Sequence, residues 1–215
     1  LVEGIKPKVL VAENVSGLIR GAAKGYFKEI MQKLKSCGYN VKCKLIDSSW
    51  LGVPQSRQRT IFIGTRLDLN KEPAYPKPFS YRYTLHDALP KLYDKEEQPF
   101  ESEVDLNGYA LGKEWDKIKV GERSKKYFQL EKPDPNKPIP TVQACHGHSP
   151  GTATACVHPF LKRKFRIDEI KLLCSFPNDF ILTGNYSQQW ERMGRAVPPL
   201  MMKAIAEAIR DKVLK

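Results

Sequence analysis

Residues 52–65 read Gly-Val-Pro-Gln-Ser-Arg-Gln-Arg-Thr-Ile-Phe-Ile-Gly-Thr, and this stretch decides the fold that we expect. The first three residues form a turn, and a Gln-x-Arg-x-Arg motif then runs directly into an apolar strand predicted over 59–65. Arginine is costly to place at the mouth of a buried strand unless an anion or a polar ligand lies there. Because Arg57 and Arg59 alternate, they point to the same side of an extended chain. We interpret them as a two-pronged clamp for a ligand, with two solvated strand-end charges as the alternative.

The segments before this stretch are typical of an open α/β sheet. Residues 9–12 form a short apolar run, as expected of a buried parallel strand. A helix is predicted over 22–36, with Gly38 as its left-handed cap. Apolar residues alternate with lysines over 41–45, which predicts a strand with one face open to water. This strand and the strand at 59–65 are close enough in sequence to pair as an antiparallel hairpin.

The texture changes after residue 69, where prolines cluster and aromatic residues interleave with lysines up to residue 140. This pattern predicts an irregular module of strands and loops; the alternative is a large insertion without a role of its own. Short helices are then predicted at 167–175 and from a cap at Ser187, and a last helix starts at Pro198-Pro199. Cys174 lies on the apolar face of the first of these helices, so we expect it in the core.

The composition favours a polyanionic partner. The 215 residues include 36 Lys and Arg against 24 Asp and Glu, a formal net charge of +12, and such an excess suits the phosphates of a nucleic acid. A merely basic protein is the alternative. Five cysteines without a C-x-x-C pair predict reduced thiols rather than a disulfide framework. No apolar run is long enough to span a bilayer, so we expect no membrane partner.

A histidine- and cysteine-rich stretch raises the question of a metal. It comprises Cys145, His146 and His148, with Cys156 and His158 downstream. Its spacing fits no standard zinc finger. We therefore predict no metal site and interpret the stretch as a loop near a nucleic acid.

Four motifs in order resemble the C-terminal half of the DNA cytosine-5 methyltransferases. They are Glu-Asn-Val at 13–15, Gln-x-Arg-x-Arg at 55–59, the segment from Pro140-Thr141-Val142 to Asp168-Glu169, and Gly-Arg-Ala-Val-Pro-Pro at 194–199. The resemblance covers the chain outside about 69–139. It implies the C-terminal part of a Rossmann-like S-adenosylmethionine-dependent methyltransferase sheet, with a smaller, irregular, β-rich target-recognition domain. The implied boundaries are 1–68 for the catalytic part, 69–167 for target recognition, 168–193 for a hinge, and 194–215 for a closing helix.

The resemblance also assigns roles to residues. In the family a cysteine thiolate adds to C6 of a flipped cytosine, and C5 then takes the methyl group. Glu13 matches the carboxyl that binds N3 and the exocyclic amine, and Arg59 matches the guanidinium near O2, where negative charge develops. Arg57 matches a residue that supports the catalytic loop or a nearby phosphate. Asn14 is expected to hold the turn.

Further positions follow by the same matching. Arg195, Ala196 and Val197 correspond to a segment near S-adenosyl-L-methionine. We expect DNA contacts from three further side chains, those of Gln55, Thr141 and Arg163.

The chain departs from the family in three respects. None of its cysteines follows a proline, so the Pro-Cys-Gln nucleophile loop is absent, and so is the glycine-rich turn that binds the cofactor. Arg195 also replaces the asparagine of the last motif. We therefore expect two partners, double-stranded DNA and an N-terminal half that is either a separate subunit or part of the same chain. A degenerate DNA-binding remnant is the first alternative, and part of an RNA methyltransferase is the second.

The resemblance implies an enzyme of DNA methylation, with a restriction-modification role expected. We expect the cytoplasm of a bacterium as the location, or the nucleus if the host is eukaryotic.

Overall fold

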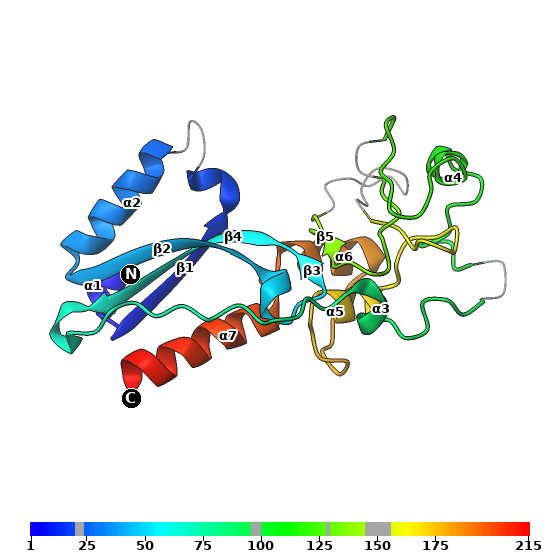
Figure 1. Cartoon of the computed structure of the whole chain (residues 1–215). Helices are drawn as coiled ribbons and strands as arrows, with labels where there is room; N and C mark the ends of the chain where they lie inside the picture. Colours follow the sequence, from blue (N-terminus) through cyan, green and yellow to red (C-terminus); the bar gives the residue numbers. More distant parts are fainter. Residues whose placement is uncertain (20–23, 96–99, 128–129, 145–155) are drawn as a thin grey trace. The chain divides into compact units, whose positions relative to one another are not determined.

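A computed structural model describes residues 1–19, 24–95, 100–127, 130–144 and 156–215 (Figure 1). The chain falls into two compact units. Unit 1 contains residues 1–47, 58–78 and 202–215, and unit 2 contains residues 48–57 and 79–201. Both units are built from segments that are distant in the sequence.

Unit 1 is organised around a three-stranded antiparallel sheet in the order β1-β4-β2. Its strands are β1 (Val9–Val15), β2 (Tyr39–Asp47) and β4 (Gln58–Arg66). The predicted hairpin is confirmed, because β2 and β4 pair antiparallel from Tyr39 opposite Arg66 to Asp47 opposite Gln58. Residues 61–65 of β4 are buried, as their apolar sequence predicts.

The prediction of a buried parallel strand at 9–12 is wrong. β1 runs antiparallel to β4 and lies at an edge of this sheet. Leu10 is buried, but residues 11–15 are exposed, and Val15 is 55% accessible. Sequence hydrophobicity cannot distinguish an edge strand with apolar residues from a central one.

Helices lie on both sides of this sheet (Figure 1). Helix α2 (Lys24–Ser36) packs against β2 on one side, and the part of α7 (Pro199–Ile209) from Met202 onward lies on the other. Gly38 ends the α2 turn with φ of 88°, which confirms the predicted left-handed cap. The remaining helical elements of this unit are α1 (Val2–Ile5), the 3-10 turns Ser16–Ile19 and Leu67–Leu69, and the π-helical turn Arg210–Leu214.

Unit 2 has little regular structure among its described residues. Two short strands pair in parallel, β3 (Gln55–Ser56) with β5 (Ile139–Pro140), and isolated bridges join other loops. The helical elements are the 3-10 turn Ser48–Leu51, α3 (Leu85–Ala88), α4 (Ala110–Trp115), α5 (Ile167–Leu173) and α6 (Tyr186–Arg195). The irregular module predicted after residue 69 therefore belongs mostly to this unit.

One of the apolar clusters in the described part of unit 2 links elements that are distant in the sequence. It joins side chains of α3 and β5 to those of α5 and α6, including Leu85, Ile139, Ile170, Cys174 and Trp190. The segment 168–193, expected as a hinge, thus shares a core with residues of the target-recognition segment. The unit boundaries accordingly differ from those expected, because 48–57 and 168–193 pack with 79–167.

Two details of unit 2 bear on the helix predictions. Helix α6 is capped by Asn185, which accepts from the backbone N–H of Gln188, so the predicted cap at Ser187 is wrong by two residues. The burial of Cys174 in the core is confirmed, with the side chain 2% exposed.

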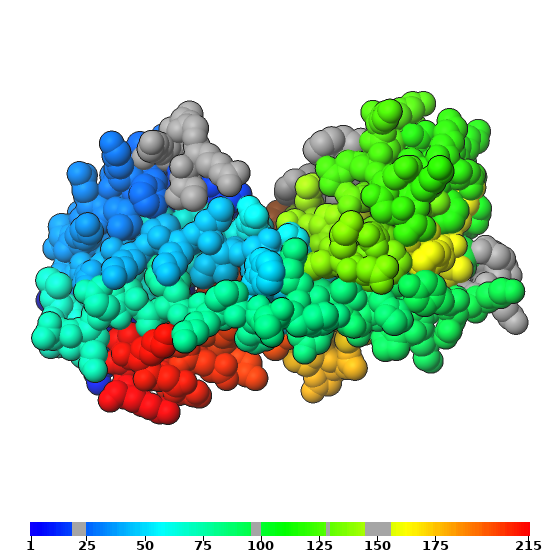
Figure 2. Space-filling view, viewed as in Figure 1, coloured from blue at the N-terminus to red at the C-terminus, as the bar shows by residue number. Residues whose placement is uncertain are grey.

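Unit 2 also exposes aromatic side chains before and after α3, and Figure 2 shows the segment around residue 85 in green at the surface. They include Tyr81 and Tyr83, whose rings meet edge to face, and Tyr93, whose ring packs at a tilt against Phe160. Within the described residues, no helix has both the length and the apolar character needed to cross a membrane.

Candidate active site

In unit 1, Glu13 and Arg59 form an ion pair at the end of the sheet. Arg59 Nε lies 2.7 Å from Glu13 Oε1, and the side chains are 13% and 29% accessible for Arg59 and Glu13. A second nitrogen, Nη1, donates to the carbonyl of Gln58 at 2.7 Å. Contacts within the protein therefore hold both side chains in place, while part of each remains accessible to solvent. It presents a carboxylate and a guanidinium together to whatever binds there.

The register of the sheet explains this pairing. Arg59 lies directly opposite Val15 across the antiparallel ladder, and Glu13 is two residues before Val15 on the same face of β1. Side chains at such diagonal positions are within reach of each other when they are long. Next to the pair, Asn14 accepts from the N–H of Val15 at 2.8 Å, as expected of a residue that holds the turn.

Arg57 has different partners in unit 2. Its side chain is buried, with Nη1 donating to the carbonyl of Val142 at 3.1 Å and Nη2 to that of Gly194 at 3.0 Å. The expected clamp of Arg57 and Arg59 on one ligand is therefore wrong. Strand β3 ends before Arg57 and β4 begins after it, so the alternation of an extended chain does not hold at this position.

Gln55 is 1% exposed and makes internal bonds. Its Oε1 accepts from the N–H of Val142 at 3.2 Å, and its Nε2 donates to Cys174 Sγ at 3.2 Å. The expectation that Gln55 contacts DNA needs correction, because its amide is buried and engaged. Thr141 is partly exposed, and its hydroxyl donates to the carbonyl of Ser56 at 2.8 Å.

Arg163 also requires a correction. Its side chain is 0% accessible, and both terminal nitrogens bind Glu169, each at 2.8 Å. Glu169 Oε2 additionally accepts from the backbone N–H of Arg166 at 2.6 Å, which caps α5. A buried, bidentate arginine is not available to a phosphate, so the predicted DNA contact of Arg163 is wrong. Sequence reasoning missed this role, although an acidic residue six positions downstream at a helix start was a visible signal.

The end of α6 carries the residues expected near a cofactor. Gly194 is in close contact with the segment before residue 145, because a Cβ there would meet the backbone N of Ala144 at 2.3 Å. Arg195 is exposed and pairs with Glu191 at 2.5 Å one turn earlier. Ala196 and Val197 continue this segment toward α7.

Three of the described cysteines, Cys43, Cys156 and Cys174, do not suit the role of nucleophile. Burial raises the pKa of the Cys43 and Cys174 thiols to about 11 and raises the pKa of the Cys156 thiol well above its usual value. A thiol nucleophile needs a lowered pKa.

Part of the histidine- and cysteine-rich stretch is described by the structure. Cys145, His146 and His148 lie outside the described residues. Cys156 is in the apolar core, and His158 Nδ1 accepts the N–H of Leu161 at 3.0 Å. Among the described residues, no group of three potential ligands is close enough to hold a metal ion.

The buried Cys174 makes stability depend on pH at the alkaline end. The folded pKa is raised, so the unfolded chain loses the thiol proton first, and the free energy of unfolding falls as pH rises from about 9 toward 11. Between about pH 8 and pH 10.5 the parent should lose roughly 2 kcal/mol relative to Cys174→Ala. Urea titrations of both proteins across this range measure the difference, and a pH-independent difference would contradict it.

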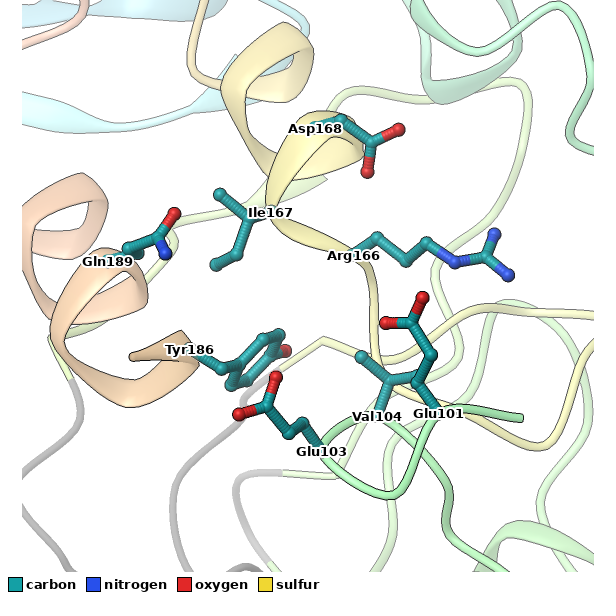
Figure 3. A pocket seen from close by; sticks show the side chains of 8 residues that line it. All are labelled: Glu101, Glu103, Val104, Arg166, Ile167, Asp168, Tyr186 and Gln189. Atoms are coloured by element: carbon teal, nitrogen blue, oxygen red, sulfur yellow. The ribbon is translucent and has the colours of Figure 1, made fainter. Parts of the chain in front are cut away.

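A pocket of about 370 Å³ lies in unit 2 beside the start of α5 (Figure 3). Its lining includes three acidic side chains, those of Glu101, Glu103 and Asp168, together with Arg166, Tyr186 and Gln189. Carboxylates repel phosphate groups, so this pocket is a poor place for a DNA backbone.

The whole chain is similar to known DNA methyltransferases. The family model for C-5 cytosine-specific DNA methylase matches residues 1–211. The type II methyltransferase M1.HphI of Haemophilus parahaemolyticus is 31% identical over 229 residues, which cover 97% of this chain and 58% of that protein. M.MthTI of Methanothermobacter thermautotrophicus is 28% identical over 226 residues, which cover 98% of this chain and 68% of that protein. The chain thus spans only part of the length of these relatives.

Solved structures share the fold. A DNA modification methyltransferase encoded within an E. coli prophage matches all of this chain and 72% of its own, with a TM-score of 0.76 at 18% identity. The match to Spodoptera frugiperda DNMT2 covers 97% of this chain and 67% of that protein, with a TM-score of 0.63 at 17% identity. These likenesses confirm the predicted fold class.

Proposed function

The chain belongs to the C-5 cytosine-specific DNA methylases, and from this premise we propose that it carries the cytosine-binding groups of a methyl-transferring enzyme. The proposed reaction moves a methyl group from S-adenosyl-L-methionine to C5 of a flipped cytosine in duplex DNA. The observation that carries the proposal is the partly open Glu13–Arg59 pair.

The geometry suits the charge that this reaction develops. Addition of a thiolate at C6 moves electron density toward N3 and O2 of the ring. The Glu13 carboxyl would hydrogen-bond N3 and the exocyclic amine, and Arg59 would stabilise the density at O2. Because their pairing already orients both groups, little reorganisation is needed when the base arrives. S-adenosyl-L-methionine supplies the methyl group, and its main binding elements would lie outside this chain.

The nucleophile would also come from outside this chain. Its cysteines include none after a proline, and three of those described have raised pKa values. We propose that a segment with a Pro-Cys-Gln loop and a glycine-rich turn completes the enzyme, either as a separate subunit or in the same polypeptide. The exposed residues of edge strand β1 offer a place for a further strand.

Alone, the 215-residue chain should not methylate DNA, because it lacks both of these elements. Incubation with labelled S-adenosyl-L-methionine and genomic DNA should incorporate no label above a no-enzyme blank. Adding the N-terminal half of a relative should restore incorporation at C5 of cytosine. Label on DNA from the chain alone would contradict the proposed division of the site. Failure of every tested N-terminal half would favour the alternative below.

A non-catalytic DNA-binding remnant is the second candidate. The net charge of +12 and the absence of a nucleophile loop fit it equally well. The Glu13–Arg59 pair favours the enzyme, since phosphate binding needs no carboxylate.

Residues 69–139 should select the methylated sequence, while the basic charge supplies general affinity. Exchanging this region with that of a relative should change the methylated site, as read by bisulfite sequencing, and preserve C5 chemistry. Binding of either protein to duplex DNA should weaken steeply as salt rises. An unchanged site after the exchange would place sequence choice elsewhere in the chain.

A further inference from the structure

A single buried guanidinium joins two backbone segments of unit 2. Arg57 is 3% exposed and donates to the carbonyl of Val142, just after β5, and to that of Gly194, in the last turn of α6. Both carbonyls are far from Arg57 in the sequence. This side chain therefore fixes the distance between the two segments.

Other contacts anchor the segment 141–144 along its whole length. The Thr141 hydroxyl donates to Ser56, and the N–H of Val142 donates to Gln55. Trp190 Nε1 of α6 donates to the carbonyl of Gln143 at 3.0 Å. The backbone of α6 at Gly194 also lies directly against the backbone of Ala144, because a Cβ added at Gly194 would lie only 2.3 Å from the N of Ala144.

We propose that Arg57 is a positioning residue for target recognition. It holds the backbone of 141–144 on the end of α6, and this segment in turn presents Thr141 to DNA. The inference rests on the proposed function, because Thr141 is the predicted DNA contact. It assigns to Arg57 an indirect action, in contrast to the direct contact of Arg59 with the base.

The junction formed by Arg57 and the carbonyls of Val142 and Gly194 needs the geometry of an arginine side chain. Its planar fork carries donors in two directions, so one side chain reaches two carbonyls at 3.1 and 3.0 Å. Lysine has a compact ammonium that cannot hold the same geometry. Replacing Arg57 with lysine leaves one buried carbonyl without a good donor. The free-energy cost of that unpaired carbonyl exceeds the net contribution of the lost hydrogen bond.

A positioning role affects recognition more than chemistry. If segment 141–144 is loosened, DNA affinity and the preference for the cognate site should both fall. The segment must then be ordered when DNA binds, and this ordering costs conformational entropy. The Glu13–Arg59 pair has its own partners in unit 1 and remains intact. The rate at saturating DNA should therefore change little.

The first arm of the test uses the isolated chain. Amide hydrogen exchange should accelerate about tenfold or more over 142–144 and 195–197 in Arg57→Lys. Thr141→Val removes only the bond to Ser56, so it should loosen the same segment less. Gly194→Ala disturbs the junction without changing a charge and should give the same exchange pattern as Arg57→Lys. Arg210→Lys, an exposed arginine paired with Asp211, is the control and should leave both regions unchanged.

The second arm uses the assembled enzyme. Arg57→Lys should lower DNA affinity and the cognate-to-near-cognate ratio about tenfold, with the single-turnover rate at saturating DNA within a few-fold of the parent. A collapse of that rate with unchanged affinity would make Arg57 a catalytic residue and overturn the proposal. Unchanged exchange in the first arm would also overturn it. An assembled parent without cytosine methylation would refute the proposed function instead, and the exchange arm would still report on the anchoring.

Discussion

Glu13→Gln should lower the single-turnover methylation rate of the assembled enzyme by about 10²- to 10³-fold, the loss typical of one oxyanion-type donor. The carboxyl interacts with the ring most strongly when charge develops toward N3, so its loss falls on the transition state rather than on the ground state. Duplex affinity should stay within a few-fold of the parent. Arg59→Ala should behave similarly, with some added loss of stability, because Glu13 then loses its ion-pair partner.

The measurement pairs single-turnover methylation with a binding titration at fixed salt. Asp68→Asn is a matched control, since Asp68 is another ion-paired carboxylate of unit 1, bound to Arg66 on the surface. It should leave both quantities unchanged. A Glu13→Gln rate within a few-fold of the parent would make Glu13 a structural residue, and the assignment of the site would fail.

The second large effect concerns stability. Glu169→Ala should lower the free energy of unfolding by about 3–5 kcal/mol, because it leaves the guanidinium of Arg163 buried without its carboxylate. It also removes the acceptor for the N–H of Arg166 at the start of α5. Urea denaturation followed by circular dichroism measures the change.

Two further variants sharpen this prediction. Glu191→Ala breaks the exposed pair with Arg195 and should change stability by about 0.5 kcal/mol or less. The double variant Arg163→Met, Glu169→Leu should recover part of the loss, because a buried pair replaced by apolar groups leaves no unpaired charge. A Glu169→Ala effect as small as that of Glu191→Ala would mean that Arg163 finds another partner or reaches solvent.

The hairpin of β2 and β4 was predictable, because strand spacing and alternation are local properties. The juxtaposition of Glu13 with Arg59 was expected only from the family resemblance, and the antiparallel register supplies its geometry. The local sequence pattern gave a wrong prediction for β1. It predicted a buried strand, but Val11, Ala12 and Val15 are exposed at an edge of the sheet.

The roles of the other polar residues depend on distant parts of the chain. Arg57 bonds to carbonyls 85 and 137 residues away. A charged residue in a motif looks like a ligand contact when such partners are invisible, and Arg163 was misassigned for the same reason. Burial of a guanidinium is a property of the tertiary structure, and no periodicity in the sequence reports it.

The division of unit 1 into three segments has a consequence for biosynthesis. Its sheet is complete once residue 66 has left the ribosome, but its last segment, 202–215, is the final part of this stretch to be made. All of 79–201 is synthesised in between and builds most of unit 2. Unit 2 can therefore fold co-translationally, while unit 1 must keep the side chains that receive Ile205, Ile209 and Val213 uncovered until the end. We therefore expect the nascent sheet to be exposed to aggregation and to chaperones during translation.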